Sequence, residues 1–113
     1  MTASVTVHTD HFATCGQITE AYIDVLAAQG FRTLINNRPD GEGGPEQPTS
    51  AALARKAEAA GLAYVYLPVI SGQISADQTE AMRDALARAE KPVLAFCRSG
   101  ARSTNLWQLA GSP

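Results

Sequence analysis

The sequence predicts an α/β fold with a mostly parallel central sheet and helices on both of its faces. Short β-prone runs alternate with helical segments along the chain, and this alternation is typical of right-handed crossovers between parallel strands. A content of 45% apolar and 18% charged residues suits a globular protein with a covered core. The 113 residues leave room for one domain, 1–113, because independent cores usually need roughly 100 residues each.

The first half of the chain predicts two strands and two helices. Thr19 is a suitable N-cap, and Gly30 and Gly61 stand where helices commonly end. Apolar side chains at positions 22, 23 and 26 would lie on one side of the first helix. We therefore expect a strand at 12–14, a helix at 19–29, a strand at 31–36 and a helix at 50–60.

The second half of the chain continues the alternation. Ser75 and Gln78 form a capping box, and Lys91-Pro92 ends the helix that follows them. The β-prone run 62–67 is of the kind found inside a parallel sheet. The expected elements are therefore strands at 62–67 and 93–96, a helix from Ser75 and a last helix at 102–109.

Composition changes abruptly at residues 39–48, where Pro, Gly and acidic residues dominate. This predicts a long loop between the second strand and the second helix. Loops of this length inside compact domains are usually mobile or functional. A tolerated surface excursion and a rim of the active site are equally open interpretations.

Charge and composition exclude several classes of function. A net charge of -2, with nine scattered Lys and Arg residues, offers no basic surface for nucleic acid. Residues 1–5 lack the segments of a secretory signal, and no apolar run approaches the roughly 18 residues of a membrane span. We therefore expect a cytoplasmic protein that binds neither nucleic acid nor membrane. Its two cysteines are expected to be free thiols.

The turn after residue 96 contains the strongest candidate site. Cys97 follows a predicted buried strand, and Arg102 stands at the start of a helix with small residues before it. Ligands in such sheets bind beyond the carboxyl ends of the strands, and the backbone N–H groups of such a turn can surround an anion. The same groups would lower the pKa of Cys97 and favour its nucleophilic thiolate. We predict Cys97 and Arg102 as catalytic residues and, as binding residues, Arg98, Ser99, Gly100, Ala101 and Ser103.

The length of this loop separates two classes of enzyme. Four residues lie between Cys97 and Arg102, as is typical of rhodanese-type sulfurtransferases, whereas Cys-dependent phosphatases have five. Segment 68–73 contains no carboxylate that could act as a general acid. Phe96 also stands where phosphatases usually have a histidine. The loop resembles that of rhodanese, and sulfur transfer tolerates these absences because a sulfite or thiolate leaves without a proton.

Several segments together resemble one family: 16–19, 35–42, 67–69, 71–74 and 97–103. They look like the beta-lactamase hydrolase-like, phosphatase-like domain family, also described as sulfurtransferases, over nearly the whole chain. The resemblance implies a dual-specificity-phosphatase-like fold with a rhodanese-type loop and Cys97 as the sulfur carrier. It also implies a fused or neighbouring persulfide dioxygenase, as in bacterial sulfide detoxification.

We predict from these observations a sulfurtransferase that works through a Cys97 persulfide. Thiosulfate or glutathione persulfide would be the donor, and cyanide, glutathione or a protein thiol the acceptor. The first alternative is a Cys-dependent, protein-tyrosine or dual-specificity-like phosphatase. The second is a non-enzymatic module that binds an anion or docks on a dioxygenase.

Arg38 is a further candidate for substrate binding. It follows the end of a predicted strand, so it should lie on the same rim as Cys97 and attract an anionic substrate. A surface arginine paired with Asp40 or Glu42 is an equally open interpretation.

A metal site is not expected. His8, His11 and Cys15 are close in sequence and could join Cys97, but their spacing matches no strong zinc pattern. Cys15 is better explained as a small buried residue, and Trp107 as part of the core. We therefore predict neither a metal nor a cofactor.

Overall fold

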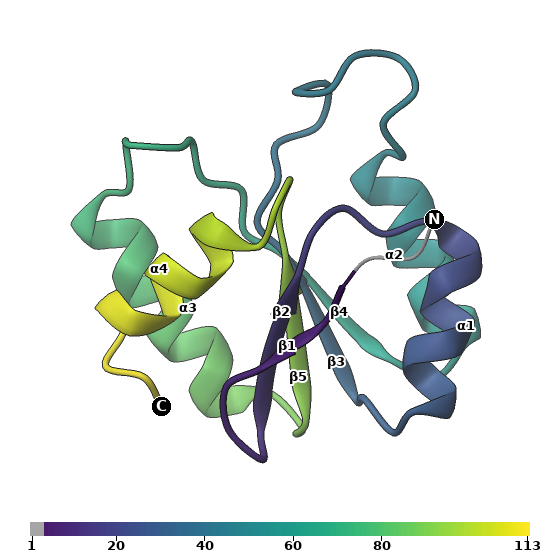
Figure 1. Cartoon of the computed structure of the whole chain (residues 1–113), viewed down its shortest axis with the longest axis horizontal. Helices are drawn as coiled ribbons and strands as arrows, with labels where there is room; N and C mark the ends of the chain where they lie inside the picture. The colour runs from purple at the N-terminus through teal and green to yellow at the C-terminus, as the bar shows by residue number, and fades with distance from the viewer. Residues whose placement is uncertain (1–3) are drawn as a thin grey trace.

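A five-stranded sheet forms the centre of the protein in a computed structural model that describes residues 4–113. Residues 1–3, part of the N-terminal segment considered above, lie outside the described residues. The strand order is β1-β2-β5-β3-β4 (Figure 1). The strands are β1 (Thr6–Val7), β2 (Phe12–Cys15), β3 (Thr33–Asn36), β4 (Ala63–Tyr66) and β5 (Val93–Phe96). The helices are α1 (Glu20–Ala28), α2 (Ser50–Ala59), α3 (Ala76–Arg88) and α4 (Ala101–Leu109).

The sheet is parallel from β2 to β4, which confirms the predicted α/β class. β5 lies at its centre, and Phe96 at its end is aligned with Cys15 of β2 and Asn36 of β3. Three strands therefore end side by side at one edge of the sheet. The antiparallel strand β1 was not predicted, because a strand of two residues is too short to show a periodicity.

Helices cover both faces of the sheet, as predicted. Figure 1 shows α1 and α2 on one face and α3 and α4 on the other. Successive residues of β5 point to opposite faces: Val93 and Ala95 belong to one core cluster, and Leu94 and Phe96 to the other. Because both faces are apolar, β5 is a buried central strand. The thiol that follows it is therefore held by a rigid element.

The predicted helix ends are confirmed to within a residue or two. Thr19 caps α1 by accepting the N–H of Tyr22, and Ser75 and Gln78 form the predicted capping box of α3. Gly30 and Gly61 follow α1 and α2 with positive φ angles of 96° and 84°. In the part of the chain that the structure describes, no helix is both long enough and apolar enough to cross a membrane.

The expectation that run 62–67 lies inside the sheet is wrong. β4 pairs only with β3 and forms an edge of the sheet, and Tyr66 is 41% exposed. Its two tyrosines form hydrogen bonds with polar neighbours, although Tyr64 also packs against a core cluster. The hydroxyl of Tyr66 accepts the backbone N–H of Asp40, and that of Tyr64 accepts a hydrogen bond from Asn36. β4 thus anchors the start of loop 39–48.

Candidate active site

Cys97 lies where the three strand ends meet. Its backbone N–H donates to the carbonyl of Cys15 at 3.4 Å, and the N–H of Asn37 donates to the carbonyl of Phe96 at 2.8 Å. These bonds continue the sheet for one residue beyond β2, β5 and β3. Cys97 is therefore fixed at the carboxyl edge of the sheet, directly before α4, as the sequence predicts.

Backbone N–H groups surround the sulfur of Cys97. The N–H of Gly100 donates to Sγ at 3.1 Å. Burial by itself raises the pKa of Cys97, but hydrogen bonds from the backbone of Ser103, Ser99, Gly100 and Arg102 outweigh it and hold the pKa below 9.0. The thiol thus faces a ring of amides at the N-terminus of α4, where a thiolate is stabilised.

Gly100 is required by the shape of this ring. Its φ angle is 94°, in the left-handed region that side chains rarely adopt. A Cβ at this position would also lie 3.3 Å from the carbonyl oxygen of Cys15. Glycine therefore lets the turn approach β2 closely enough for the N–H of residue 100 to reach the sulfur.

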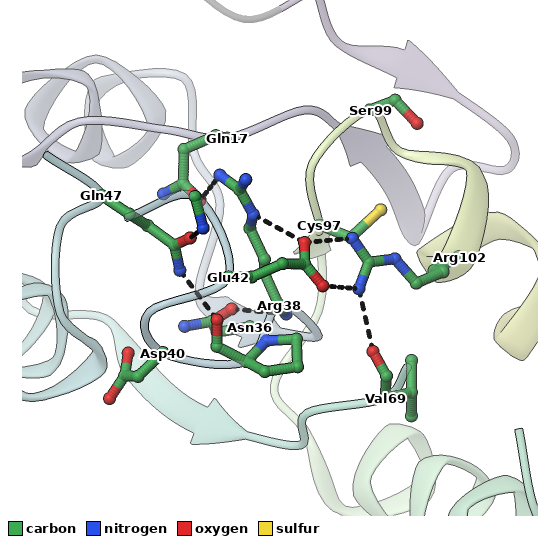
Figure 2. Close-up of polar contacts among 12 residues, drawn as sticks. Gln17, Asn36, Arg38, Asp40, Glu42, Gln47, Val69, Cys97, Ser99 and Arg102 are labelled. Carbon is green, nitrogen blue, oxygen red and sulfur yellow. Dashed lines mark hydrogen bonds and ion pairs between the residues drawn. The ribbon is translucent and has the colours of Figure 1, made fainter. Parts of the chain in front are cut away.

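The guanidinium of Arg102 is held from outside the loop. Nη1 donates to Glu42 at 2.7 Å and to the carbonyl of Val69 at 2.9 Å, and Nη2 donates to Glu42 at 2.6 Å. Arginine has five N–H donors, so these bonds leave the edge formed by Nε and Nη2. Glu42, and to a smaller extent Cys97, raise the pKa of Arg102 against the burial that opposes them, and the sulfur of Cys97 lies on the side opposite to Val69 (Figure 2). The remaining edge can therefore donate to an oxyanion at the thiol.

Glu42, which the sequence analysis did not select, joins loop 39–48 to this site. Its carboxylate lies between Arg102 and Arg38, and Oε1 accepts from Nε of Arg38 at 2.9 Å (Figure 2). Hydrogen bonds from Arg102 and then Arg38 lower the pKa of Glu42 to about 2 against the burial that opposes them. The residue is therefore ionised at neutral pH. The available signal in the sequence was an acidic residue in a long loop, four residues after the predicted binding residue Arg38.

Arg38 lies on the rim of the site, and it is not a surface residue. It is 8% exposed, and its Nη1 donates to Oε1 of Gln17 at 3.1 Å. Its carboxylate partner is Glu42, since Asp40 instead accepts the backbone N–H of Ser50. The two interpretations of Arg38 are therefore each right in part, because the same side chain lies on the rim and pairs with an acid of the loop.

The serine hydroxyls of the loop do not bond to the sulfur. Oγ of Ser103 donates to Oδ1 of the buried Asn37 at 2.8 Å, so Ser103 supports the thiolate through its backbone alone. Oγ of Ser99 accepts the N–H of Ala101 at 3.4 Å. Asn37 in turn donates to the carbonyl of Leu67. It is a second residue that the sequence analysis missed, and it ties α4 to the ends of β3 and β4.

A cavity of about 650 Å³ opens beside the loop. Its walls combine loop 39–48, the segment after β4 and the start of α4. The lining residues are Arg38, Glu42, Gly43, Ser71, Arg98, Ser99, Ala101 and Arg102. Most of the predicted binding residues thus face one space, with Gly100 and Ser103 buried beneath it. Cys97 is 0% exposed and does not itself line the cavity, so its sulfur lies beneath the cavity wall.

The weaker candidates take no part in this site. His8 lies against Trp107 and within 2.8 Å of Oγ1 of Thr14, and Trp107 is buried as predicted. Burial, and then the charge of Cys97, raise the pKa of Cys15 to about 12, so this buried thiol stays protonated. No three metal-binding side chains gather anywhere within residues 4–113.

Sequence comparison places the chain among known proteins. A family model described as "Beta-lactamase hydrolase-like protein, phosphatase-like domain" matches residues 4–112. Beta-lactamase hydrolase-like proteins from Xylella fastidiosa and Agrobacterium fabrum are 41% identical over 92 residues and 40% identical over 94 residues. The matches cover 81% and 83% of this chain but 21% and 22% of those proteins. The chain thus spans about a fifth of the length of these relatives.

Solved structures share the fold. A candidate phosphatase from Neisseria meningitidis has a TM-score of 0.81 and 36% identity, over 88% of this chain and 70% of its own. A candidate phosphatase from Shewanella putrefaciens has a TM-score of 0.83 and 22% identity, over 94% and 66%. TpbA of Pseudomonas aeruginosa has a TM-score of 0.70 and 14% identity, over 96% and 64%. The predicted phosphatase-like fold is therefore confirmed.

The predicted sulfurtransferase activity, with its rhodanese-type persulfide chemistry, is wrong. The structural neighbours from Neisseria, at 36% identity, and from Shewanella are described as candidate phosphatases, and none of the neighbours is described as a sulfurtransferase. The number of residues between Cys97 and Arg102 was misleading because Glu42 and Val69 position the guanidinium from outside the loop, and loop length does not report these contacts. A single domain over 1–113 and a persulfide dioxygenase partner stay predictions.

We predict that Gly100→Ala raises the pKa of Cys97. The added Cβ would press on the carbonyl of Cys15 and draw the N–H of residue 100 away from the sulfur. Thiolate absorbance in the ultraviolet, titrated against the Cys97→Ser protein as blank, measures the shift. Gly61→Ala is the matched control, since its φ is also positive at 84° but nothing lies within 4 Å. Both variants should lose about 1 kcal/mol of stability, and an unchanged titration in Gly100→Ala would contradict the role of its N–H.

We also predict a pH-dependent stability contribution from Glu42. Because its pKa falls from 4.5 to about 2 in the folded protein, its ion pairs stabilise the fold fully above pH 4.5 and lose this effect as the pH falls through 2. Glu42→Gln should therefore be less stable than the wild type at pH 7, by about 1 kcal/mol for a partly exposed pair.

Urea unfolding at a series of pH values measures this contribution. The difference between wild type and Glu42→Gln should shrink towards zero between pH 4.5 and 2. Glu90→Gln is the control, because Glu90 pairs with Arg32 at 3.5 Å with both side chains largely exposed. A Glu42→Gln difference that is constant over this range would rule out the ion-pair origin.

Proposed function

The chain belongs to the beta-lactamase hydrolase-like, phosphatase-like domain family, and we propose on this premise that it is a cysteine-dependent phosphatase. The observation that supports this most directly is the ring of N–H groups around Cys97, with its lowered pKa and the adjacent edge of Arg102. A thiolate within an oxyanion site is the arrangement that nucleophilic phosphoryl transfer needs. The likeness to a Neisseria protein described as a candidate phosphatase supports the same activity.

In the first step the thiolate of Cys97 attacks the phosphorus of the substrate. A sulfur–phosphorus bond forms, the bond from phosphorus to the leaving oxygen breaks, and the electron pair of that bond stays on the leaving group. The negative charge on the non-bridging oxygens is met by the loop N–H groups and by Nε and Nη2 of Arg102. These donors are already in place before the reaction, so little reorganisation is needed.

In the second step water attacks the phosphorus of the thiophosphate on Cys97. The sulfur–phosphorus bond breaks, its electron pair returns to sulfur, and the proton of the attacking water passes to solvent. Inorganic phosphate is released and the thiolate is restored. The low pKa of the thiol assists here, because a stable thiolate is a good leaving group.

We predict that Cys97→Ser abolishes phosphate release from p-nitrophenyl phosphate, with a loss of at least about a thousandfold in kcat. The hydroxyl of serine has no stabilised anion in this ring and is a poor nucleophile at neutral pH. Colorimetric detection of p-nitrophenol and of phosphate gives two independent readouts. Cys15→Ala is the matched control, since that thiol is buried, protonated and outside the cavity, and it should keep the activity.

The pH profile supplies a second check. Activity requires the thiolate, so kcat/KM should rise with pH through the pKa of Cys97 and fall away below it. This acid limb should lie below pH 9.0, the ordinary thiol value. If phosphate release is equal in the wild type and Cys97→Ser, or if no release is found at any pH, the proposal is refuted.

A further inference from the structure

The walls of the cavity are polar and charged. Apart from Ala101, its lining is made of arginine, glutamate, serine and glycine residues. An aryl phosphate gains much of its binding energy from apolar or aromatic walls around the ring. The exposed side chain of Ile70 is next to Ser71 in sequence but does not line the cavity. These walls therefore favour a hydrophilic substrate without a ring.

Arg98 leaves one positive charge of the cavity without a partner. Arg38 and Arg102 both pair with Glu42. The exposed side chain of Arg98 lines the same cavity, and its guanidinium makes no hydrogen bond or ion pair with any of residues 4–113. Arg98 immediately follows Cys97 in the sequence and lines this cavity, but it is not part of the amide ring. It can therefore bind a second anionic group of the substrate.

The cavity supplies no proton to a leaving group. Glu42 is the only carboxyl residue in its lining, and its pKa of about 2 keeps it ionised. An alkyl phosphate would have to release an alkoxide whose conjugate acid is about as weak as water, with a pKa of about 15.7. A phosphate leaving group has a pKa of about 6 and departs as a stable anion. This chemistry favours a substrate whose leaving group is itself a phosphate.

Resting on the proposed phosphatase activity, we propose that the substrate is a phosphoric anhydride of the inorganic, short-chain polyphosphate class. Cys97 attacks the terminal phosphorus, the anhydride oxygen–phosphorus bond breaks, and its electron pair remains on the departing phosphate chain. Arg98 binds the charge of that chain. Water then cleaves the thiophosphate, as for any other substrate of the site, and no acid is required.

The size of the cavity agrees with this class. A volume of about 650 Å³ accommodates a small ligand of several phosphate units. The nucleoside of a nucleotide would find no apolar wall in this lining, so the inorganic anhydride is the better match. Glu42 does not bind the polyphosphate, because its carboxylate is already shared by Arg38 and Arg102.

Steady-state kinetics of the full chain with inorganic tripolyphosphate tests the proposal. Phosphate release is measured in the presence of EDTA, which silences contaminating metal-dependent pyrophosphatases, and is compared with p-nitrophenyl phosphate, glycerol phosphate and ATP. We expect tripolyphosphate to have the highest kcat/KM and glycerol phosphate the lowest. Arg98→Gln should lower the tripolyphosphate to p-nitrophenyl phosphate ratio of kcat/KM about tenfold, the value of one charged hydrogen bond. Arg55→Gln removes the same charge from an exposed site on α2, outside the lining, and should keep the ratio.

The outcomes separate this inference from the function on which it rests. If no substrate releases phosphate in a Cys97-dependent way, both fail. If p-nitrophenyl phosphate is cleaved but tripolyphosphate is not preferred, or if Arg98→Gln leaves the ratio unchanged, the phosphatase stands and the anhydride is rejected. Preference for ATP over tripolyphosphate would also overturn the inorganic class.

Discussion

The site depends on the register that brings the ends of β2, β5 and β3 to one line. Phe96 is aligned with both Cys15 and Asn36, so Cys97 is the last residue held by the sheet, and the chain turns away after it. Gly100 completes that turn against β2, and α4 begins directly behind it. A slip of one residue in any of these pairings would exchange the two faces of the strand. The amide ring around Cys97 therefore depends on the register of the sheet as well as on the sequence of the loop.

A second constraint couples this ring to a loop far away in sequence. Arg102 is 9% exposed and Arg38 is 8% exposed, and cations as little exposed as these need a carboxylate partner. One carboxylate, that of Glu42, pairs with both. The ion pair between Glu42 and Arg102 also determines which edge of the guanidinium remains free to bind an anion. Loop 39–48 thereby becomes part of the active site, although it contributes no group that reacts.

The sequence predicted the elements and the position of Cys97 well, because these depend on local signals. The helix caps at Thr19 and Ser75, and a cysteine at the end of a buried strand, can be recognised from residues that are close together in the sequence. The edge position of β4 could not be predicted, since its apolar run suits an interior strand equally well. Glu42 was expected only as a possible partner of Arg38, and Asn37 was missed, for the same reason. Their partners, Arg102 and Ser103, are 60 and 66 residues away along the chain, and spacing within a motif does not report such contacts. The wrong enzyme class followed from relying on that spacing.

The charges of the site explain how an ionised carboxylate can stand beside an anion-binding loop. Glu42 repels an incoming phosphoryl group at long range, but the loop attracts it with backbone dipoles, which are fixed and need no counterion. Both oxygens of the Glu42 carboxylate accept hydrogen bonds from guanidinium groups. The electric field of the carboxylate is therefore largely cancelled within the cavity. What remains is a thiolate held by dipoles, one edge of Arg102 and the unpaired charge of Arg98. In the proposed phosphatase, such a site would select substrates by where their negative charge is located after the phosphorus–oxygen bond breaks, because it can hold an anion on either side of that bond and its lining has no protonated carboxyl group to donate a proton.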